Sequence, residues 1–161
     1  MEPLKIIKYP DDIVRKRCAL VDKITESEIK LFKDMLFTMR YFKGIGLAAP
    51  QIGVNKSLIV ADIGYGVIQL ANPKILKMEG FVKWEEGCLS VPGAIVAIRR
   101  PDEIVVSGIN EKNKAIELRA RGLLARVLQH EVDHLNGKLI IDYLGLLGKI
   151  KLFQQDFMHF K

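Results

Sequence analysis

A pair of histidines near the C-terminal end constrains this chain more than any other feature. His130 and His134 lie in "QHEVDHLNG" at residues 129–137. A spacing of four residues turns through about 400° on an α-helix, so the two imidazoles share one face. Residues 118–137 carry apolar side chains at helical spacing, which predicts the helix that this geometry needs. Two imidazoles on one face with Glu131 between them are typical of a divalent-metal site.

The rest of the chain predicts what packs around that helix. Residues 25–42 have a helical apolar stripe, and Thr25 with Glu28 forms the sequence pattern of a capping box. Between residues 57 and 118, short runs rich in β-branched residues are separated by Gly, Pro and Asn, which favours antiparallel strands. Helix, strands and then helix is an α+β order rather than alternating βαβ units.

After Gly137, the expected C-terminal cap, the sequence predicts a short strand at residues 138–142 and a weak helix at 144–160. We therefore expect an α+β fold with antiparallel β-sheets packed around a central HExxH helix, an N-terminal helix and a short C-terminal helix. A length of 161 residues favours a single domain covering residues 1–161.

Composition excludes a few function classes. No apolar run approaches the roughly 20 residues needed to span a bilayer, and the first residues resemble no export signal. We expect a cytoplasmic protein with no membrane partner. The net charge of +6 would suit an acidic partner such as RNA, but Lys and Arg are scattered along the chain. The two cysteines, Cys18 and Cys88, are expected to be reduced thiols, with Cys18 an ordinary buried side chain.

Two histidines leave a catalytic metal site incomplete, because such sites usually have three protein ligands and one open position. Ile140 occupies the place where one class of metalloprotease has a third histidine, and His159 lies in a tail that frays readily. Asp142 is a downstream alternative. Upstream, "EEGCLSVP" at 85–92 places Cys88 in a loop bounded by Gly and Pro. We predict that Cys88 is the third ligand, since a thiolate with two imidazoles suits Zn²⁺ or Fe²⁺.

With Cys88 included, three separate motifs resemble the peptide deformylase family. They are "GIGLAAPQ" at 44–51, "EGCLS" at 86–90 and "QHEVDHLNG" at 129–137, in that order along the chain. The resemblance implies a metal-dependent hydrolase that removes the N-terminal formyl group from formylmethionyl nascent polypeptides and releases formate. A water activated at the metal would attack the formyl carbon.

The resemblance also assigns roles to individual residues. It implies Cys88, His130 and His134 as metal ligands and Glu131 as general base. The oxyanion would be met by catalytic donors on two further residues, which are the side-chain amide of Gln51 and the backbone N–H of Leu89. The residues implied in substrate binding are Ile45, Gly46, Trp84, Glu86, Gly87, Leu123, Arg126 and Val127. Arg100 and Asp133 would support the metal ligands, and we predict that Glu86 or Asp133 pairs with Arg100.

One divalent ion is the implied cofactor, with Fe²⁺ as the working ion and Zn²⁺, Ni²⁺ or Co²⁺ as replacements in a purified sample. The implied partners are formylmethionyl nascent peptides and a transient contact with the ribosome, for which Lys149, Lys151 and Lys161 offer little basic surface. We expect a monomer that binds no DNA. Ile95 stands where many relatives have Arg or Tyr, so contacts beyond the substrate methionine are expected to differ.

Two other hypotheses stay open at this point. One is a metalloprotease with Asp142 as third ligand, and the other is a basic RNA-binding domain in which the three ligand residues are structural. Loss of metal on exchange of Cys88 would separate the first from the deformylase.

Overall fold

The computed structural model describes residues 2–148 and 150, and it confirms the expected α+β fold. The first long helix, α1 (Glu26–Tyr41), begins at the predicted capping box. Thr25 accepts a hydrogen bond from the Ser27 N–H at 3.3 Å, while the Glu28 carboxylate accepts one from the Thr25 N–H at 2.9 Å. These bonds satisfy N–H groups that have no partner within the helix, which is why α1 begins there.

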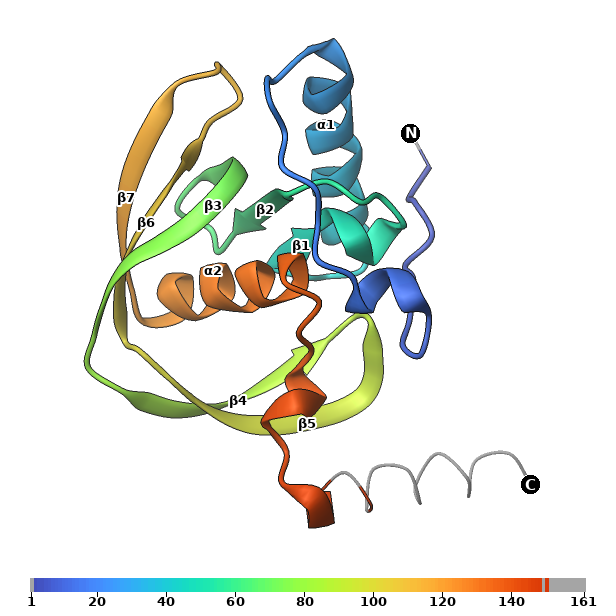
Figure 1. The fold of residues 1–161 in the computed structure, drawn as a ribbon, viewed down its shortest axis with the longest axis vertical. Coiled ribbons are helices and arrows are strands. Elements are labelled where there is room, and N and C mark those ends of the chain that lie inside the picture. Colours follow the sequence, from blue (N-terminus) through green and yellow to red (C-terminus); the bar gives the residue numbers. More distant parts are fainter. Residues whose placement is uncertain (1, 149, 151–161) are drawn as a thin grey trace.

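Seven strands lie in the described residues, and each predicted β-rich run falls in one of them. Their bounds are β1 (Gly46–Ala48), β2 (Leu58–Asp62), β3 (Val67–Glu79), β4 (Val82–Cys88), β5 (Val91–Arg100), β6 (Glu103–Ile109) and β7 (Ala115–Arg121). Five strands form one antiparallel sheet in the order β1-β2-β3-β6-β7, and β4 pairs with β5 in a separate hairpin (Figure 1). The strand β1, which the sequence pattern did not predict, lies at one end of the larger sheet.

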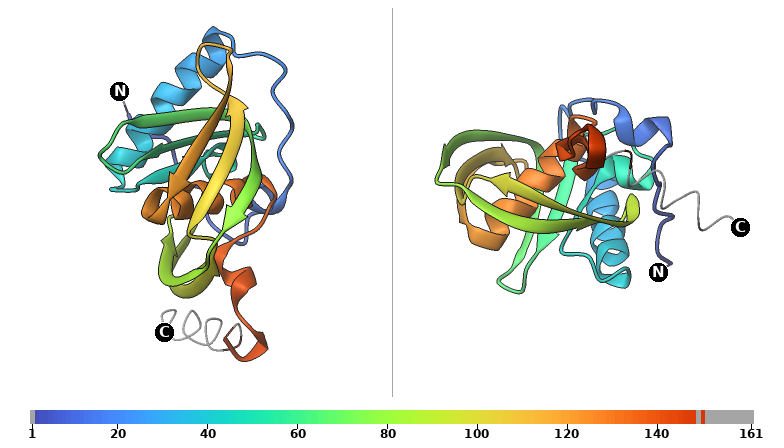
Figure 2. Two further views of the ribbon diagram at one scale, coloured as in Figure 1. Left: turned by 90° about the vertical axis from the view of Figure 1, so that its left-hand side faces the viewer. Right: turned by 90° about the horizontal axis from the view of Figure 1, so that it is seen from below.

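The second helix, α2 (Gly122–Leu135), crosses the hollow of the curved sheet (Figures 1 and 2). The strand β2 shows why both faces of the sheet are covered. Ile59 and Ala61 belong to the buried cluster that includes α2, whereas Leu58 and Val60 belong to the cluster that includes α1. Alternate side chains of a strand point to opposite faces, so the four apolar residues 58–61 of β2 are buried between two helices. The HExxH helix is central, as expected.

The helix α2 begins later than the sequence pattern predicts. Residues 118–121 have apolar spacing compatible with a helix, but they extend β7 by pairing with residues 103–106 of β6. The ladder of backbone hydrogen bonds to a neighbouring strand outweighs the local pattern there. At its other end α2 stops as predicted, since Gly137 follows the cap Asn136 with a positive φ of 71°.

The strand predicted at residues 138–142 is wrong. This segment contains the short helix η3 (Ile140–Tyr143). The Asp142 carboxylate accepts a hydrogen bond from the Leu139 N–H at 2.8 Å and pairs with Arg15 at 2.5 Å, and both contacts favour a turn over an extended chain. Residues 146–148 and 150 are helical, and the remainder of the predicted C-terminal helix lies outside the described residues.

Two further single-turn helices matter for the site, η1 (Asp12–Arg15) and η2 (Ala49–Ile52).

Among the described residues, no helix is long and apolar enough to cross a membrane.

Candidate metal centre

Three side chains from two elements converge at the end of the β4–β5 hairpin. Cys88 is the last residue of β4, and His130 and His134 lie one turn apart on α2. The Cys88 Sγ lies 3.2 Å from the His134 Nε2, which in turn lies 3.1 Å from the His130 Nε2. All three potential ligand atoms lie within 4.8 Å of one another. The structure therefore brings together the three residues that were predicted as ligands.

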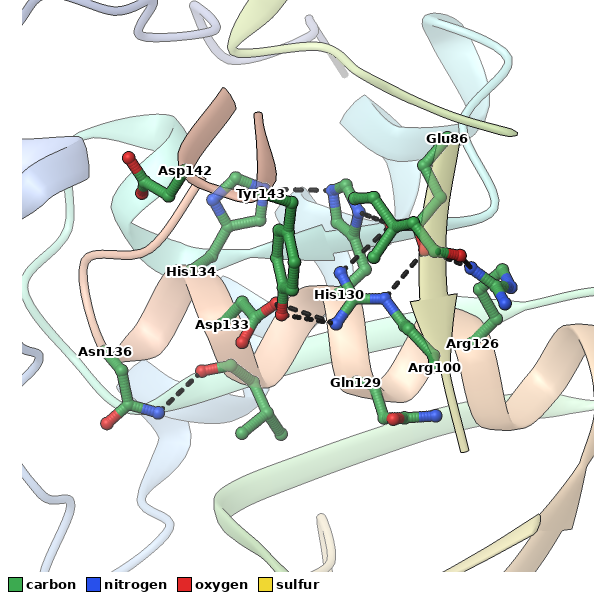
Figure 3. Close-up of polar contacts among 12 residues, drawn as sticks. Glu86, Arg100, Arg126, Gln129, His130, Asp133, His134, Asn136, Asp142 and Tyr143 are labelled. Carbon is green, nitrogen blue, oxygen red and sulfur yellow. Dashed lines mark hydrogen bonds and ion pairs between the residues drawn. The ribbon is translucent and has the colours of Figure 1, made fainter. Parts of the chain in front are cut away.

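Glu86 fixes the orientation of His130. Its carboxylate contacts the His130 Nδ1 at 2.9 Å, so the Nε2 atom faces the cluster (Figure 3). Glu86 is buried, and burial opposes its ionisation. Hydrogen bonds from His130 and Arg100 nevertheless lower the pKa of Glu86 to about 2. A fixed negative charge behind the imidazole holds the ring in place and makes its exposed nitrogen a better ligand.

Arg100 connects this carboxylate to a second carboxylate, that of Asp133 on α2. Its guanidinium donates to both Glu86 oxygens, at 2.7 and 3.0 Å, and to Asp133 at 2.8 Å (Figure 3). The predicted pairing of Arg100 is therefore confirmed for both carboxylates. Tyr143 completes the group, because its hydroxyl donates to Asp133 at 2.7 Å and accepts from Arg100 at 3.0 Å.

Arg126 also binds Glu86, at 2.6 Å, and donates to the carbonyls of Ile98 and Val82. These bonds join α2 to both strands of the hairpin that carries Cys88. Trp84 lies against the guanidinium of Arg126, with 5.1 Å between the guanidinium carbon and the ring centroid.

Glu131 is the second buried carboxylate of the site. Its Oε2 atom has no hydrogen-bond partner among the described residues. Burial is the largest influence on this group and raises the pKa of Glu131 to about 7. The carboxyl group can thus take up and release a proton near neutral pH.

Close packing holds Glu131 against β1. A Cβ atom added to Gly46 would lie 2.3 Å from the Glu131 Oε1 and 2.7 Å from a methyl group of Val127. Only glycine allows this approach between the backbone of β1 and α2.

Gln51 is held on the other side of the sulfur. Its Oε1 accepts a hydrogen bond from the Ala48 N–H at 2.8 Å, which turns the amide nitrogen toward the cluster. That nitrogen lies 3.3 Å from the Ser90 hydroxyl and 3.7 Å from the Cys88 Sγ. A side-chain N–H donor is therefore fixed beside the predicted ligands.

A cleft of about 490 Å³ opens beside the cluster between β1 and the β4–β5 hairpin. It is lined by Gln51, Leu89, Glu131 and His130, and by every predicted substrate-binding residue except Trp84. The ring of Trp84 packs on Arg126, which itself lines the cleft, and the substrate-binding role of Trp84 stays a prediction. The predicted residues that do line the cleft are Ile45, Gly46, Glu86, Gly87, Leu123, Arg126 and Val127.

Two further residues of the site, Tyr143 and Ser90, were not selected from their sequence pattern. Tyr143 is the last residue of η3 and directly follows the strand predicted at 138–142, and no local signal marks it. Ser90 lies within the "EGCLS" motif, so its position two residues after Cys88 was the only available signal. The alternative ligand Asp142 is wrong, since its carboxylate binds Arg15 and the Leu139 N–H. His159 lies outside the described residues.

The donor set fits a single divalent ion. One thiol sulfur and two imidazole nitrogens are the ligands that Zn²⁺ and Fe²⁺ accept, and three protein ligands leave a further position open. Burial lowers the pKa of His134 well below its ordinary value, so this imidazole is neutral, as a ligand must be. The buried Nδ1 of His134 has no hydrogen-bond partner among the described residues. The polar contacts of this ring are therefore those of its Nε2 with the Cys88 sulfur and the His130 Nε2.

Known proteins resemble the chain along most of its length. The sequence model of the family described as polypeptide deformylase matches residues 3–149. A peptide deformylase of Hydrogenovibrio crunogenus is 46% identical over 158 residues, which cover 96% of this chain and 94% of the relative.

Solved structures give the same result. The crystal structure of a peptide deformylase from Legionella pneumophila superposes with a TM-score of 0.92 at 40% identity, covering 99% of this chain and 97% of the other. A Met-Ala-Ser complex of a peptide deformylase from Acinetobacter baumannii has a TM-score of 0.84 at 30% identity, covering 89% and 99% of the two chains.

Proposed function

Because the chain belongs to the polypeptide deformylase family, we propose that it deformylates formylmethionyl peptides in the cleft between β1 and the β4–β5 hairpin. Metal-dependent hydrolysis of an N-formyl group is the activity of the family. The observation that carries the assignment to this cleft is the convergence of Cys88, His130 and His134 beside it, with Cys88 and His130 in its lining.

Cys88, His130 and His134 would hold the ion. A divalent ion held there supplies Lewis acidity, which polarises the formyl carbonyl and lowers the pKa of the attacking water. Glu131 is the general base. Its buried Oε2, which has no partner in the part of the chain that the structure describes, belongs to a side chain that lines the cleft next to the ligands, so it can accept the proton of the water and pass it to the departing amine.

Gln51 and Leu89 stabilise the negative charge that develops on the formyl oxygen. The amide nitrogen of Gln51 is fixed by the bond between its own Oε1 and the Ala48 N–H, so it need not reorganise during the reaction. Leu89 lines the cleft directly after Cys88, and its backbone N–H would supply a second donor. Fixed donors of this kind are typically worth about 3 kcal/mol each in the transition state.

The substrate methionine would occupy the apolar part of the cleft, against Leu123, Val127 and the stem of Arg126. The strand β1 lies at the end of its sheet, so its outer edge can pair with an extended peptide as an added strand. The Met-Ala-Ser complex of the Acinetobacter baumannii relative supports this choice of substrate.

Arg100 and Asp133 would act by holding Glu86, the hairpin and α2 in register. We further propose Fe²⁺ as the working ion, a monomeric, single-domain enzyme, and a cytoplasmic location with a transient ribosome contact. The lysines named for that contact, Lys149, Lys151 and Lys161, lie outside the described residues.

Formate release from formyl-Met-Ala-Ser tests the proposal. The protein is loaded anaerobically with Fe²⁺, and bound metal is measured in the same sample. Glu131→Gln should retain the metal but lose turnover by a factor of about 10²–10⁴, because it removes only the proton acceptor. Cys88→Ala should lose the metal, whereas the matched control Cys18→Ala should keep both metal and turnover.

Formate release by Glu131→Gln at the wild-type rate would exclude Glu131 as the base. Full metal content in Cys88→Ala would exclude the sulfur as a ligand. Absence of formate from the fully loaded wild-type protein would contradict the substrate assignment.

A further inference from the structure

The segment before η1 contacts the two loops that carry the proposed catalytic donors. The Ile7 N–H donates to the Gln51 carbonyl at 2.8 Å, and the Tyr9 N–H donates to the Ser90 carbonyl at 2.8 Å. Gln51 lies in η2, and Ser90 lies between β4 and β5. Residues 7–9 therefore bridge two segments that are about 40 residues apart in the chain.

We infer that residues 7–9 form a positioning strap that fixes the side chain of Gln51 against the ligand cysteine. The inference rests on the oxyanion role proposed for Gln51. The strap itself touches no reacting atom.

Both strap bonds end on residues that orient the Gln51 amide. One holds the backbone of Gln51. The other holds Ser90, whose hydroxyl lies 3.3 Å from the Gln51 nitrogen. Both Gln51 and Ser90 are buried. A shift of either loop by a fraction of an ångström would change the distance between the amide nitrogen and the Cys88 sulfur, now 3.7 Å. Such small displacements of a positioned donor are costly in catalysis.

The chain that follows the strap, up to Cys18, is anchored to the end of α2. The Cys18 N–H donates to the Leu135 carbonyl at 2.8 Å, directly after the ligand His134. The Arg15 side chain pairs with Asp142 at 2.5 Å. A Cβ added to Gly137 would lie 2.2 Å from the Arg15 carbonyl oxygen, so the chains are in close contact there. Residues 7–18 thus contact all three segments that contain the sequence motifs, as the blue trace in Figure 1 shows beside η2 and the end of α2.

A backbone amide-to-ester exchange tests the strap without changing a side chain. Replacing Ile7 by its α-hydroxy acid removes the N–H that binds the Gln51 carbonyl, and the same change at Tyr9 removes the bond to Ser90. The matched control is the same exchange at Lys8, which is exposed and whose N–H donates no hydrogen bond within the described residues. Each metal-loaded protein is assayed with formyl-Met-Ala-Ser, and melting temperature and bound metal are measured alongside.

The esters at residues 7 and 9 should each lower kcat roughly fivefold, the value of one hydrogen bond, with KM and bound metal unchanged. The ester at residue 8 should leave kcat unchanged. In a Gln51→Ala background the ester at residue 7 should change kcat by less than about 1.5-fold, because the side chain through which it acts is absent.

Combining the ester at residue 7 with Gln51→Ala separates an effect on the position of the Gln51 side chain from an effect on the stability of the fold. An ester that lowers only the melting temperature, or that lowers kcat equally with and without the Gln51 side chain, would overturn the strap alone. Wild-type turnover in Gln51→Ala would overturn the oxyanion role of Gln51, and the strap with it.

Discussion

Replacing Arg100 by methionine removes the charge that joins β5, Glu86 and α2 while keeping most of the apolar stem. Arg100 is 4% exposed and donates to Glu86, Asp133 and Tyr143. Removing one partner of a buried ion pair typically costs about 3–5 kcal/mol. Glu86 retains Arg126 and His130, so we expect the lower end of that range, about 3 kcal/mol of unfolding free energy.

That loss corresponds to a fall in melting temperature of roughly 6–12 °C for a chain of this size. The measurement is urea unfolding at pH 7, followed by the fluorescence of Trp84, the single tryptophan. Metal affinity, from competition with a chelator, should fall by about 10- to 100-fold, since Glu86 orients His130 and Asp133 lies between the two histidines.

Arg99→Met is the matched control, one residue away on the same strand. Arg99 is exposed, with its guanidinium 4.9 Å from the Phe81 ring centroid, and its loss should cost under about 1 kcal/mol. An unfolding free energy for Arg100→Met within about 0.5 kcal/mol of the wild type, with metal affinity unchanged, would refute the reasoning.

Three smaller tests address other parts of the structure. Gly46→Ala should displace the Glu131 carboxylate and lower the rate of formate release at least about tenfold, with bound metal unchanged. Turnover at the wild-type rate would contradict the close contact between Gly46 and Glu131. Hydrogen bonds from Lys56 and Thr25 lower the pKa of Glu28 below its ordinary value of 4.5. The contribution of this carboxylate to the stability of the fold is therefore present above that pH and is lost as the pH falls. The stability advantage of the wild type over Glu28→Gln should therefore be constant from pH 8 to about 6 and shrink below about pH 5, as measured by urea unfolding; an advantage that grew on acidification would show the sign to be wrong. Burial raises the pKa of the Cys18 thiol to about 11. Iodoacetamide at pH 8 should therefore label Cys88 of the chelator-treated protein and leave Cys18 unmodified, as measured by mass spectrometry. Equal labelling of the two cysteines would contradict this expectation.

Local patterns were sufficient where the physics is local. The capping box at Thr25 and the helical stripe after it predicted α1 to within one residue at each end. Each β-rich run became a strand, because its content of β-branched residues between Gly, Pro and Asn is a property of the run itself. The pattern failed at residues 118–121 and 138–142. In both places a distant partner decided the conformation, β6 in one case and Arg15 in the other.

The same distinction between local and distant interactions applies to the residues of the site. The spacing of His130 and His134 determined their shared face, because four residues make about one helical turn wherever the helix lies. Cys88 was predicted as the third ligand because its loop is bounded by Gly and Pro and a thiolate suits such a site, while Asp142 stayed open as an alternative. The bond between Arg100 and the Tyr143 hydroxyl and the packing of Trp84 on Arg126 could not be predicted, since each joins segments far apart in the chain.

By itself, then, the sequence determined which atoms could bind a metal and which helix presents two of them. Only the tertiary structure decided that the Cys88 sulfur lies 3.2 Å from the His134 nitrogen and that Glu86 stands behind His130. The physical reason is that helical geometry follows from neighbours along the chain, whereas the approach of a hairpin to a helix depends on packing and buried charge across the whole fold.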